Sequence, residues 1–413
     1  MDVQLTSLAP TGGWLPASAT AGALPAETDV LVVGGGLAGA AIAYYLAREG
    51  VEVVLVERGE LNREASGTNA GSFHFQIALH QLTAMETGNI RGKLLTEVRL
   101  HVEAAEVWAE LERELDGPLD IHTTGGLMVA ETEEELQLLQ DKRELEREAG
   151  LEVEVLTGRE LRDFAPYLAD RVLGATYCPE EGHANPALAT PLFALRAAQA
   201  GATIRTHVEV TGIAADQDAG ARRFAVPTSS GTITAHRLVN AGGAWASEIA
   251  RHVGLDLPIR GDGLHINVTE PREHVLKPMV QHIGRRLTLK QASNGTFILG
   301  GGWPARPEAR PHRYSTIWQS MAGNAAVAVD VVPFLADVRV VRTWSGVMAF
   351  TPDLAPMVGE SARVPGYHSL MATTGFTLSP LMARQLAESM TGARTSFPPD
   401  YDVDRFANAT TTT

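Results

Sequence analysis

The spacing of apolar and polar positions predicts a strand, a helix and a second strand near the start of the chain. Residues 30–33 are all apolar, as expected for a strand that is buried on both faces. A helical pattern follows over about 37–49 and stops at Gly50, a common residue after a helix end. The apolar run 53–56 then predicts a second buried strand.

The pattern changes further along the chain. Four segments alternate as strands do, and no helix of regular length separates the last three: "GGLMVA" (125–130), "LHINVTE" (264–270), "RRLTLKQ" (285–291) and "TFILGGG" (296–302). Such closely spaced strands predict an antiparallel sheet. Helical patterns are present at 92–115 and in the strongly charged stretch 131–149.

Three glycines make the first unit chemically specific. Gly34, Gly36 and Gly39 have G-x-G-x-x-G spacing between the first strand and the helix, and Glu57 ends the second strand. The first glycine permits a tight turn, the second lets a pyrophosphate approach the backbone, and the third lets the helix pack on the strand. A carboxylate at Glu57 can accept both ribose hydroxyls, which favours a dinucleotide without a 2′-phosphate. The motif leaves NAD and FAD both open.

Two later segments extend this α/β domain. Residues 172–213 have the pattern strand, loop, helix, strand, and 235–254 that of strand, glycine turn and helix. We therefore predict an α/β fold with a discontinuous Rossmann-like dinucleotide-binding domain and an inserted α+β substrate domain built on the antiparallel sheet. The predicted segments are 28–90, 155–258 and 336–400 for the first domain, 91–154 and 259–335 for the second, 1–27 for a mobile N-terminal extension and 401–413 for a tail.

Charge and composition narrow the partners. The formal net charge of −15 disfavours nucleic acid and anionic membrane surfaces. No run of about 18 apolar residues predicts a membrane span. The one cysteine, Cys178, excludes an internal disulfide and favours a reducing compartment, so we expect a cytoplasmic protein in which Cys178 is a buried structural thiol. No histidine has metal-ligand spacing with the cysteine, and no metal is expected.

Several motifs in the second half of the chain resemble one family of flavoproteins. "LVNAGGAWAS", "EGHANPALATPLFALRAAQAGATI", "RTWSGVMAFTPDLAPMVG" and "TTGFTLSPLMARQLAE" are similar, in the same order, to segments of the family that contains glycine oxidase, D-amino acid oxidase and sarcosine dehydrogenase. The stretch 287–303 is most similar to the β-type subunits of sarcosine, opine and imino-acid dehydrogenases. The resemblance covers about 28–395.

The resemblance implies non-covalent FAD and identifies the residues that would bind it. The small residues at 66–71 would surround the isoalloxazine, and the turn at 375–378 would face its pyrimidine edge. Ser379 before Pro380 predicts a helix start there, whose positive end would stabilise the reduced ring. The full set expected to bind FAD is Gly34, Gly36, Leu37, Ala38, Gly39, Glu57, Arg58, Ser66, Gly67, Asn69, Ala70, Gly71, Ser72, Val208, Ala241, Gly242, Trp245, Gly346, Gly375, Phe376, Thr377 and Leu378.

Two departures from the family pattern bear on the substrate. Glycine oxidase-like members have arginines that bind a carboxylate, and the matching positions here are Met348 and Thr377. On the strand 285–291, Arg286, Thr288 and Lys290 alternate and would point to one face. Arg286 and Lys290 are therefore candidates to bind the substrate carboxylate, although both could equally be solvent-facing residues.

Other candidate substrate-site residues are Thr377 and His265, with His74 as a further possibility; both histidines could instead be structural. The resemblance implies oxidation of the C–N bond of an amino acid or secondary amine by hydride transfer to flavin N5, giving an imine that hydrolyses. It also implies a small-molecule amine or amino-acid substrate. One alternative is a flavin-bearing β subunit of a hetero-oligomeric amine dehydrogenase with an electron-acceptor partner. Another is a flavin monooxygenase, which the segment "ATTGFTLSP" disfavours. The substrate, the electron acceptor and the oligomeric state stay open.

Overall fold

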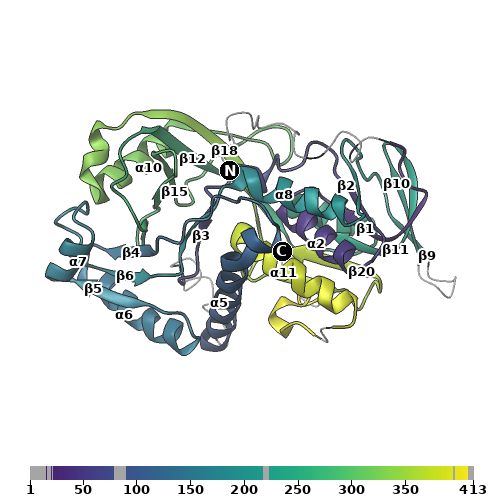
Figure 1. Ribbon diagram of the computed structural model, residues 1–413, viewed down its shortest axis with the longest axis horizontal. Coiled ribbons are helices and arrows are strands. Elements are labelled where there is room, and N and C mark those ends of the chain that lie inside the picture. The colour runs from purple at the N-terminus through teal and green to yellow at the C-terminus, as the bar shows by residue number, and fades with distance from the viewer. Residues whose placement is uncertain are drawn as a thin grey trace.

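Two large sheets lie side by side in the computed structural model, with helices α5 (Ile90–Glu114) and α11 (Gly375–Met390) between them (Figure 1). The structure describes residues 15, 20, 22–78, 90–216, 223–393 and 396–407. Much of the predicted extension 1–27 and the last residues of the predicted tail 401–413 lie outside this part of the chain.

The first sheet contains the dinucleotide motif. Its strands are, in spatial order, β19 (Met357–Glu360), β20 (Tyr367–Met371), β11 (Gly231–Asn240), β1 (Glu27–Val33), β2 (Val53–Val56) and β8 (Thr203–Arg205), with β10 (Arg223–Thr228) and β9 (Ala214–Asp216) beyond β11. The pairs from β20 to β8 are parallel. The two apolar runs predicted from sequence are thus neighbouring buried strands in the parallel part of a mixed sheet.

Helices cover this sheet, and the hydrophobic core lies between them and the strands. They are α2 (Leu37–Arg48), α8 (Pro186–Gln199), α9 (Ala246–Arg251) and the terminal helix α11. The third glycine of the motif has the predicted packing role, because a Cβ added at Gly39 would lie 1.9 Å from the carbonyl oxygen of Gly34. Gly50, with φ of +79°, follows the end of α2 as predicted.

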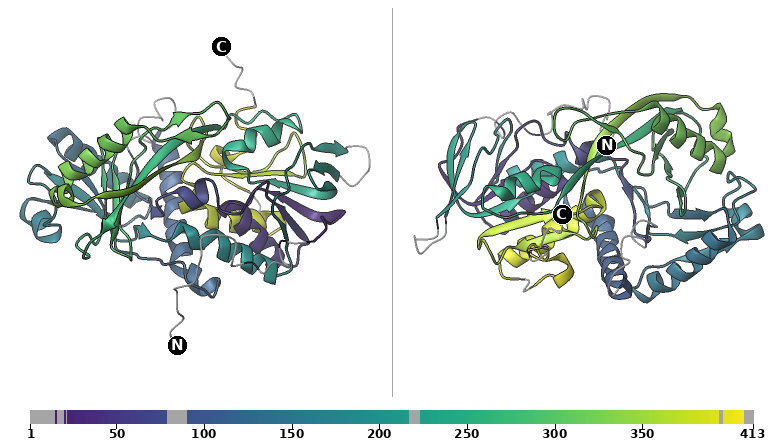
Figure 2. Two further views of the ribbon diagram at one scale, coloured as in Figure 1. Left: turned by 90° about the horizontal axis from the view of Figure 1, so that it is seen from above. Right: turned by 180° about the vertical axis from the view of Figure 1, so that it is seen from behind.

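The second sheet lies on the other side of α5 and α11 (Figures 1 and 2). Its spatial order is β18 (Val340–Phe350), β12 (Arg260–Pro271), β15 (Thr296–Gly300), β14 (Thr288–Gln291), β13 (Met279–His282), β4 (Gly126–Ala130), β6 (Gly174–Cys178) and β5 (Glu154–Thr157). All neighbours are antiparallel except β13 and β4, which are parallel. The predicted antiparallel substrate sheet is therefore present, with one parallel pair.

The remaining elements complete the two halves. They are α6 (Glu133–Glu148), α7 (Gly158–Phe164), α10 (Trp318–Val331), the short α3 (Ala65–Thr68), the paired strands β3 (Ser72–Phe73) with β7 (Gly182–His183) and β16 (Arg306–Pro307) with β17 (Tyr314–Ser315), and 3₁₀ turns at Gly243–Trp245, Pro333–Asp337 and Pro399–Tyr401. Among the described residues, none of the helices combines the length and the apolar character needed to cross a membrane. Cys178 is buried in β6, and burial raises the pKa of its thiol.

Sheet membership differs from the predicted segment limits in two places. The segments 155–258 and 336–400 were predicted for the dinucleotide-binding domain. The first contains β6 and almost all of β5, and the second contains β18, yet all three strands belong to the second sheet. The cause is physical: an apolar or alternating run marks a strand, but which sheet it joins depends on contacts with residues far away in sequence.

Two local boundaries also differ. Residues 285–287 precede β14 instead of belonging to it, so Arg286 lies in a turn before the strand. Helix α11 begins at Gly375 and not at Ser379, and Pro380 lies inside it. The first turn is helical because it is packed: Leu378 is fully buried, and the indole N–H of Trp108 donates to the carbonyl of Thr377 at 2.8 Å. The prediction of a helix start at Ser379 was therefore wrong by one turn.

Candidate cofactor and substrate site

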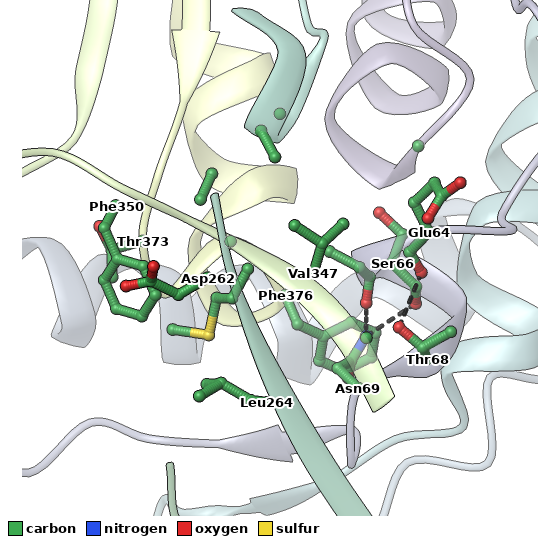
Figure 3. Close-up of a pocket in the computed structure, with 18 of the residues that line it drawn as sticks. Glu64, Ser66, Thr68, Asn69, Asp262, Leu264, Val347, Phe350, Thr373 and Phe376 are labelled. Atoms are coloured by element: carbon green, nitrogen blue, oxygen red, sulfur yellow. Dashed lines mark hydrogen bonds between the residues drawn. The ribbon is translucent and has the colours of Figure 1, made fainter. Parts of the chain in front are cut away.

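A single large cavity joins the dinucleotide turn to the face of the second sheet. Its volume is about 1560 Å³, more than the roughly 300–1,000 Å³ usual for a drug-sized ligand, as needed for a dinucleotide with a substrate beside it. Figure 3 shows residues of its wall, with Glu64, Ser66, Thr68 and Asn69 on one side and Asp262, Phe350 and Thr373 on the other.

The glycine turn and Glu57 form one end of the cavity. A Cβ at Gly34, whose φ is +116°, would lie 2.5 Å from the carbonyl oxygen of Ala241, so the turn tolerates only glycine there. The carboxylate of Glu57 accepts the N–H of Gly35 at 2.7 Å through Oε2 and that of Gly59 at 2.8 Å through Oε1. The acid expected at the ribose therefore also fixes the backbone of the turn.

An arginine and a tryptophan stack beside this end. The guanidinium carbon of Arg58 lies 4.0 Å from the ring centre of Trp245, and both residues line the cavity. A stacked pair presents a flat, partly apolar wall next to Glu57, which suits the adenosine half of a dinucleotide.

The loop around α3 is held by its own side chains. The hydroxyl of Ser66 accepts the N–H of Leu37 at 2.9 Å, which places Ser66 at the N-terminus of α2. Asn69 donates to the carbonyls of Ala65 at 2.9 Å and Ser66 at 2.7 Å, and accepts the N–H of Gly71 at 2.7 Å (Figure 3). These bonds fix a narrow wall of small residues before any ligand binds.

The N-terminus of α11 opens into the same cavity. Thr374, Gly375, Phe376 and Thr377 line it, and the side chain of the N-cap residue, Thr374, makes no capping hydrogen bond. The first N–H groups of a helix need acceptors, and the helix dipole favours negative charge there. A Cβ at Gly375 would have only the Ser379 hydroxyl within 4 Å, at 3.9 Å, so space is open for a bound group. These observations fit the electron-rich edge of a reduced flavin.

Most of the residues predicted to bind FAD line the cavity. They are Gly34, Gly36, Ala38, Glu57, Arg58, Ser66, Asn69, Ala70, Gly71, Ser72, Val208, Ala241, Gly242, Trp245, Gly346, Gly375, Phe376 and Thr377. Leu37, Gly39, Gly67 and Leu378 are not part of the wall. Leu37 and Leu378 are buried core residues, whereas Cβ atoms at Gly39 and Gly67 would each meet a backbone oxygen at 1.9 Å.

The structure separates the two cations proposed to bind a carboxylate. Arg286 lines the cavity, donates to the carbonyl of Gly302 at 3.2 Å, and has no acidic partner in the described part of the chain. Lys290 is not part of the wall; it is 3% exposed, and burial lowers its pKa to about 7. The two side chains would alternate on one face only if both residues were in one strand, but Arg286 precedes β14.

His265 of β12 is a second polar residue of the wall. It is 1% exposed, and neither ring nitrogen has a hydrogen-bond partner among the described residues. Burial lowers its pKa, which favours the neutral imidazole with one donor and one acceptor. Thr377, the other predicted substrate-site residue, is 2% exposed with its Oγ1 3.4 Å from the N–H of His74.

A buried polar network at the second sheet was not predicted. Glu181, fully buried, accepts the N–H groups of Phe75 and Gln76 at 2.9 Å each and the Gln76 amide at 3.0 Å. Gln76 in turn accepts from Lys142 and Thr176. The one available signal was a glutamine in each of two apolar strand-like stretches, "SFHFQ" and "MVQH".

His101 of α5 also lines the cavity. Its Nδ1 lies 2.9 Å from the carbonyl of Phe75, which can only accept, so Nδ1 carries the proton. Burial lowers the pKa of His101 to about 4, and Nε2 has no hydrogen-bond partner within the described part of the chain. This face of the cavity therefore presents neutral acceptors.

Comparison with known proteins agrees with this geometry. The model of the DAO family, described as "FAD dependent oxidoreductase", matches residues 29–389. The human mitochondrial sarcosine dehydrogenase is 29% identical over 83% of this chain and 37% of its own length. The sarcosine oxidase subunit beta of an Arthrobacter species is 29% identical over 81% of this chain and 79% of its own length. The chain spans about two fifths of the first curated relatives that it matches.

A solved structure has the same overall fold. The L-proline dehydrogenase from P. horikoshii superposes with a TM-score of 0.81 at 25% identity, covering 94% of this chain and 99% of that chain.

Proposed function

Because the chain belongs to the DAO family of FAD-dependent oxidoreductases, we propose that it oxidises the C–N bond of an amino acid or a secondary amine. When bound, FAD supplies the hydride acceptor, and the resulting imine hydrolyses in water. The observation that carries this proposal is the continuity of one cavity from the glycine turn, past the uncapped start of α11, to the polar face of the second sheet.

The chain's own residues supply binding and orientation. Glu57 and the glycine turn would hold the adenosine end, the loop of Ser66 and Asn69 would fix the ring plane, and the N–H groups of Gly375–Thr377 would stabilise negative charge on the reduced ring. The reaction then depends on placing the substrate carbon over the ring.

For the substrate carboxylate we favour Arg286 over Lys290. Arg286 lines the cavity without an acidic partner in the described residues, whereas Lys290 lies outside the wall. Arg286 is solvent-exposed, so its guanidinium is not buried unpaired in the free protein and can pair with a carboxylate that enters the cavity.

The test is anaerobic reduction of the purified protein by a panel of amines and amino acids. We expect a yellow protein that releases intact FAD on denaturation and whose visible absorbance is bleached by at least one N-substituted glycine, cyclic imino acid or D-amino acid. A correctly folded colourless protein that binds NAD would contradict the proposal. Repeating the reaction with oxygen or an artificial acceptor would then separate oxidase from dehydrogenase activity.

A second candidate has the same chemistry in a larger assembly. One similar protein is named a subunit beta, so this chain would be the flavin-bearing subunit of a hetero-oligomer, with the electron acceptor on a partner. Native mass measurement after expression in its own host tests this: one species with the mass of this chain alone would contradict it. A reducing compartment such as the cytoplasm is the proposed location, in keeping with the single cysteine.

A further inference from the structure

Gln281 of β13 presents one open hydrogen-bond acceptor to the cavity. Its side-chain nitrogen lies 3.4 Å and 3.2 Å from the two carboxylate oxygens of Glu181. Its Oε1 has no hydrogen-bond partner among the described residues, and it is not one of the unpartnered atoms sealed from solvent. Since Gln281 is only 6% exposed and lines the cavity, this oxygen is open to the cavity.

Glu181 determines which end of the amide is open. Its oxygens already accept two backbone N–H groups and the amide of Gln76. A carboxylate in this setting offers lone pairs, so Gln281 must turn its NH₂ group toward it and leave the carbonyl oxygen outward. The orientation is thus set by the network and not by the ligand.

Contacts around Gln281 connect it with the candidate carboxylate-binding residue, Arg286, and with the start of α11. Thr288 is the Cα partner of Gln281 across β13 and β14, and Arg286 lies two positions before it, with both on the cavity wall. On the other side, Glu181 binds Gln76, and the nearby N–H of His74 lies 3.4 Å from Oγ1 of Thr377 at the start of α11. Gln281 is therefore linked through Thr288 to the segment of Arg286, and through Glu181 and Gln76 to the segment that contacts the start of α11.

We propose that Gln281 is a specificity-determining residue whose Oε1 accepts the N–H of the substrate amine, with Glu181 as the positioning residue behind it. This inference rests on the proposed function. A neutral primary or secondary amine has an N–H to donate, whereas a neutral tertiary amine has none. The site should therefore favour N–H-bearing amines over their N-methylated tertiary counterparts.

The experiment compares matched substrate pairs: sarcosine with N,N-dimethylglycine, and proline with N-methylproline. For each, the dissociation constant comes from the perturbation of flavin absorbance and the reduction rate from anaerobic stopped flow. We expect the wild-type holoenzyme to prefer the N–H-bearing member, and Gln281→Met to reduce that preference about fivefold, the effect of one ordinary hydrogen bond. Glu181→Gln should reduce it as well, because the Gln281 amide can then rotate.

Gln291 provides a matched control in the neighbouring strand β14. It is 5% exposed, and its amide is satisfied by backbone groups, including the N–H of Val275 at 3.0 Å and the carbonyl of Glu273 at 2.9 Å. It does not line the cavity. Gln291→Met should lower stability while the ratio between paired substrates stays at the wild-type value. If Gln281→Met does not fold, Gln281→Asn, which shortens the side chain, should show the same loss of preference.

The outcomes separate this inference from the proposed function. If amines bleach the flavin but wild type, Gln281→Met and Gln281→Asn have the same pairwise preference, the role of Gln281 is wrong and the proposed function stands. A wild-type preference for the tertiary amines would also overturn the inference. If no amine binds or bleaches the wild-type flavin, the proposed function fails and the inference with it.

Discussion

Glu57 lines the proposed ribose end of the cavity, and its carboxylate fixes the backbone at Gly35 and Gly59. Glu57→Gln replaces an acceptor-only carboxylate by an amide whose NH₂ group would meet one of these N–H donors. We expect FAD binding to weaken by about 1–2 kcal/mol, the value of a lost charge-assisted bond. Titrating the apoprotein with FAD measures it, with Glu52→Gln as the control because Glu52 is exposed and outside the cavity wall. Equal affinity in both variants would remove Glu57 from the ribose site.

Arg286 and Lys290 can be distinguished by substrate binding. Arg286→Met should raise the apparent dissociation constant of a carboxylate-bearing substrate about tenfold or more, since losing one partner of a close charge pair costs roughly 2–5 kcal/mol. Lys290→Met should leave this constant unchanged. Reductive half-reaction kinetics give both values. The opposite result would return the carboxylate site to Lys290, and no change in either variant would direct attention to His265 or to a substrate without a carboxylate.

Lys290 should instead control stability as a function of pH. Its pKa is lowered by burial to about 7 in the folded protein, whereas an unfolded lysine titrates near 10.4. Below about pH 7 the amine is charged in both states, so folding bears the full desolvation cost. This cost disappears as pH rises from about 7 to 10.4, because there the unfolded state binds more protons. Lys290→Met should therefore raise the free energy of unfolding more at pH 6 than at pH 10, measured by urea denaturation. An equal gain at both values would show that the amine is not desolvated.

Gly39 and Gly375 both lie in the first turn of a helix, but the absence of a side chain matters at each position for a different physical reason. Gly39 in α2 is needed by the protein's own packing, since its Cβ would meet the oxygen of Gly34, whereas Gly375 in α11 has open space. Gly375→Ala should keep or slightly raise the stability of the apoprotein and weaken FAD binding. Gly39→Ala should lower both. Thermal unfolding of the apoprotein and FAD titration test this pair. If Gly375→Ala leaves FAD affinity unchanged, the flavin does not approach that backbone.

Sequence patterns were sufficient where an element depends on its own residues. The run 30–33, the glycine turn and the helix ending before Gly50 follow from local periodicity and backbone conformation, and the structure confirms them. The start of α11 could not be predicted in this way, because Trp108, far away in sequence, satisfies the Thr377 carbonyl. Gln281 was missed for a similar reason: its significance arises only when Glu181 lies beneath it.

At the scale of the whole molecule, the sheet to which a strand belongs was the least predictable property. Strand β18 pairs with β12 over its length in the second sheet, and the chain then returns to β19 and β20 of the first. The two halves are thus connected several times, and the cavity has walls from both. Local hydrophobic patterns contain no information on such crossings.

This shared cavity predicts that FAD stabilises the whole molecule as one unit. A ligand that binds only the folded state adds about 2.7 kcal/mol when present at 100 times its dissociation constant. Calorimetry of the apoprotein with increasing FAD should show the unfolding of both halves moving together to higher temperature. Two transitions, of which only one responds to FAD, would show that the second sheet contributes nothing to cofactor binding.

The glycine turn at Gly34 and the start of α11 at Gly375 lie far apart in the sequence, and this distance affects the order in which the protein can assemble. The turn at Gly34 is synthesised before the start of α11 at Gly375, and β1, which leads into that turn, needs β11 as its neighbour. At usual rates of synthesis these two parts of one cavity emerge from the ribosome roughly 20–70 s apart. Until β11 (Gly231–Asn240) has emerged, β1 lacks this partner, and until α11 has emerged the cavity lacks the wall formed by its first turn. Stable flavin capture should therefore follow the synthesis of α11, because only then does the cavity have both of its parts.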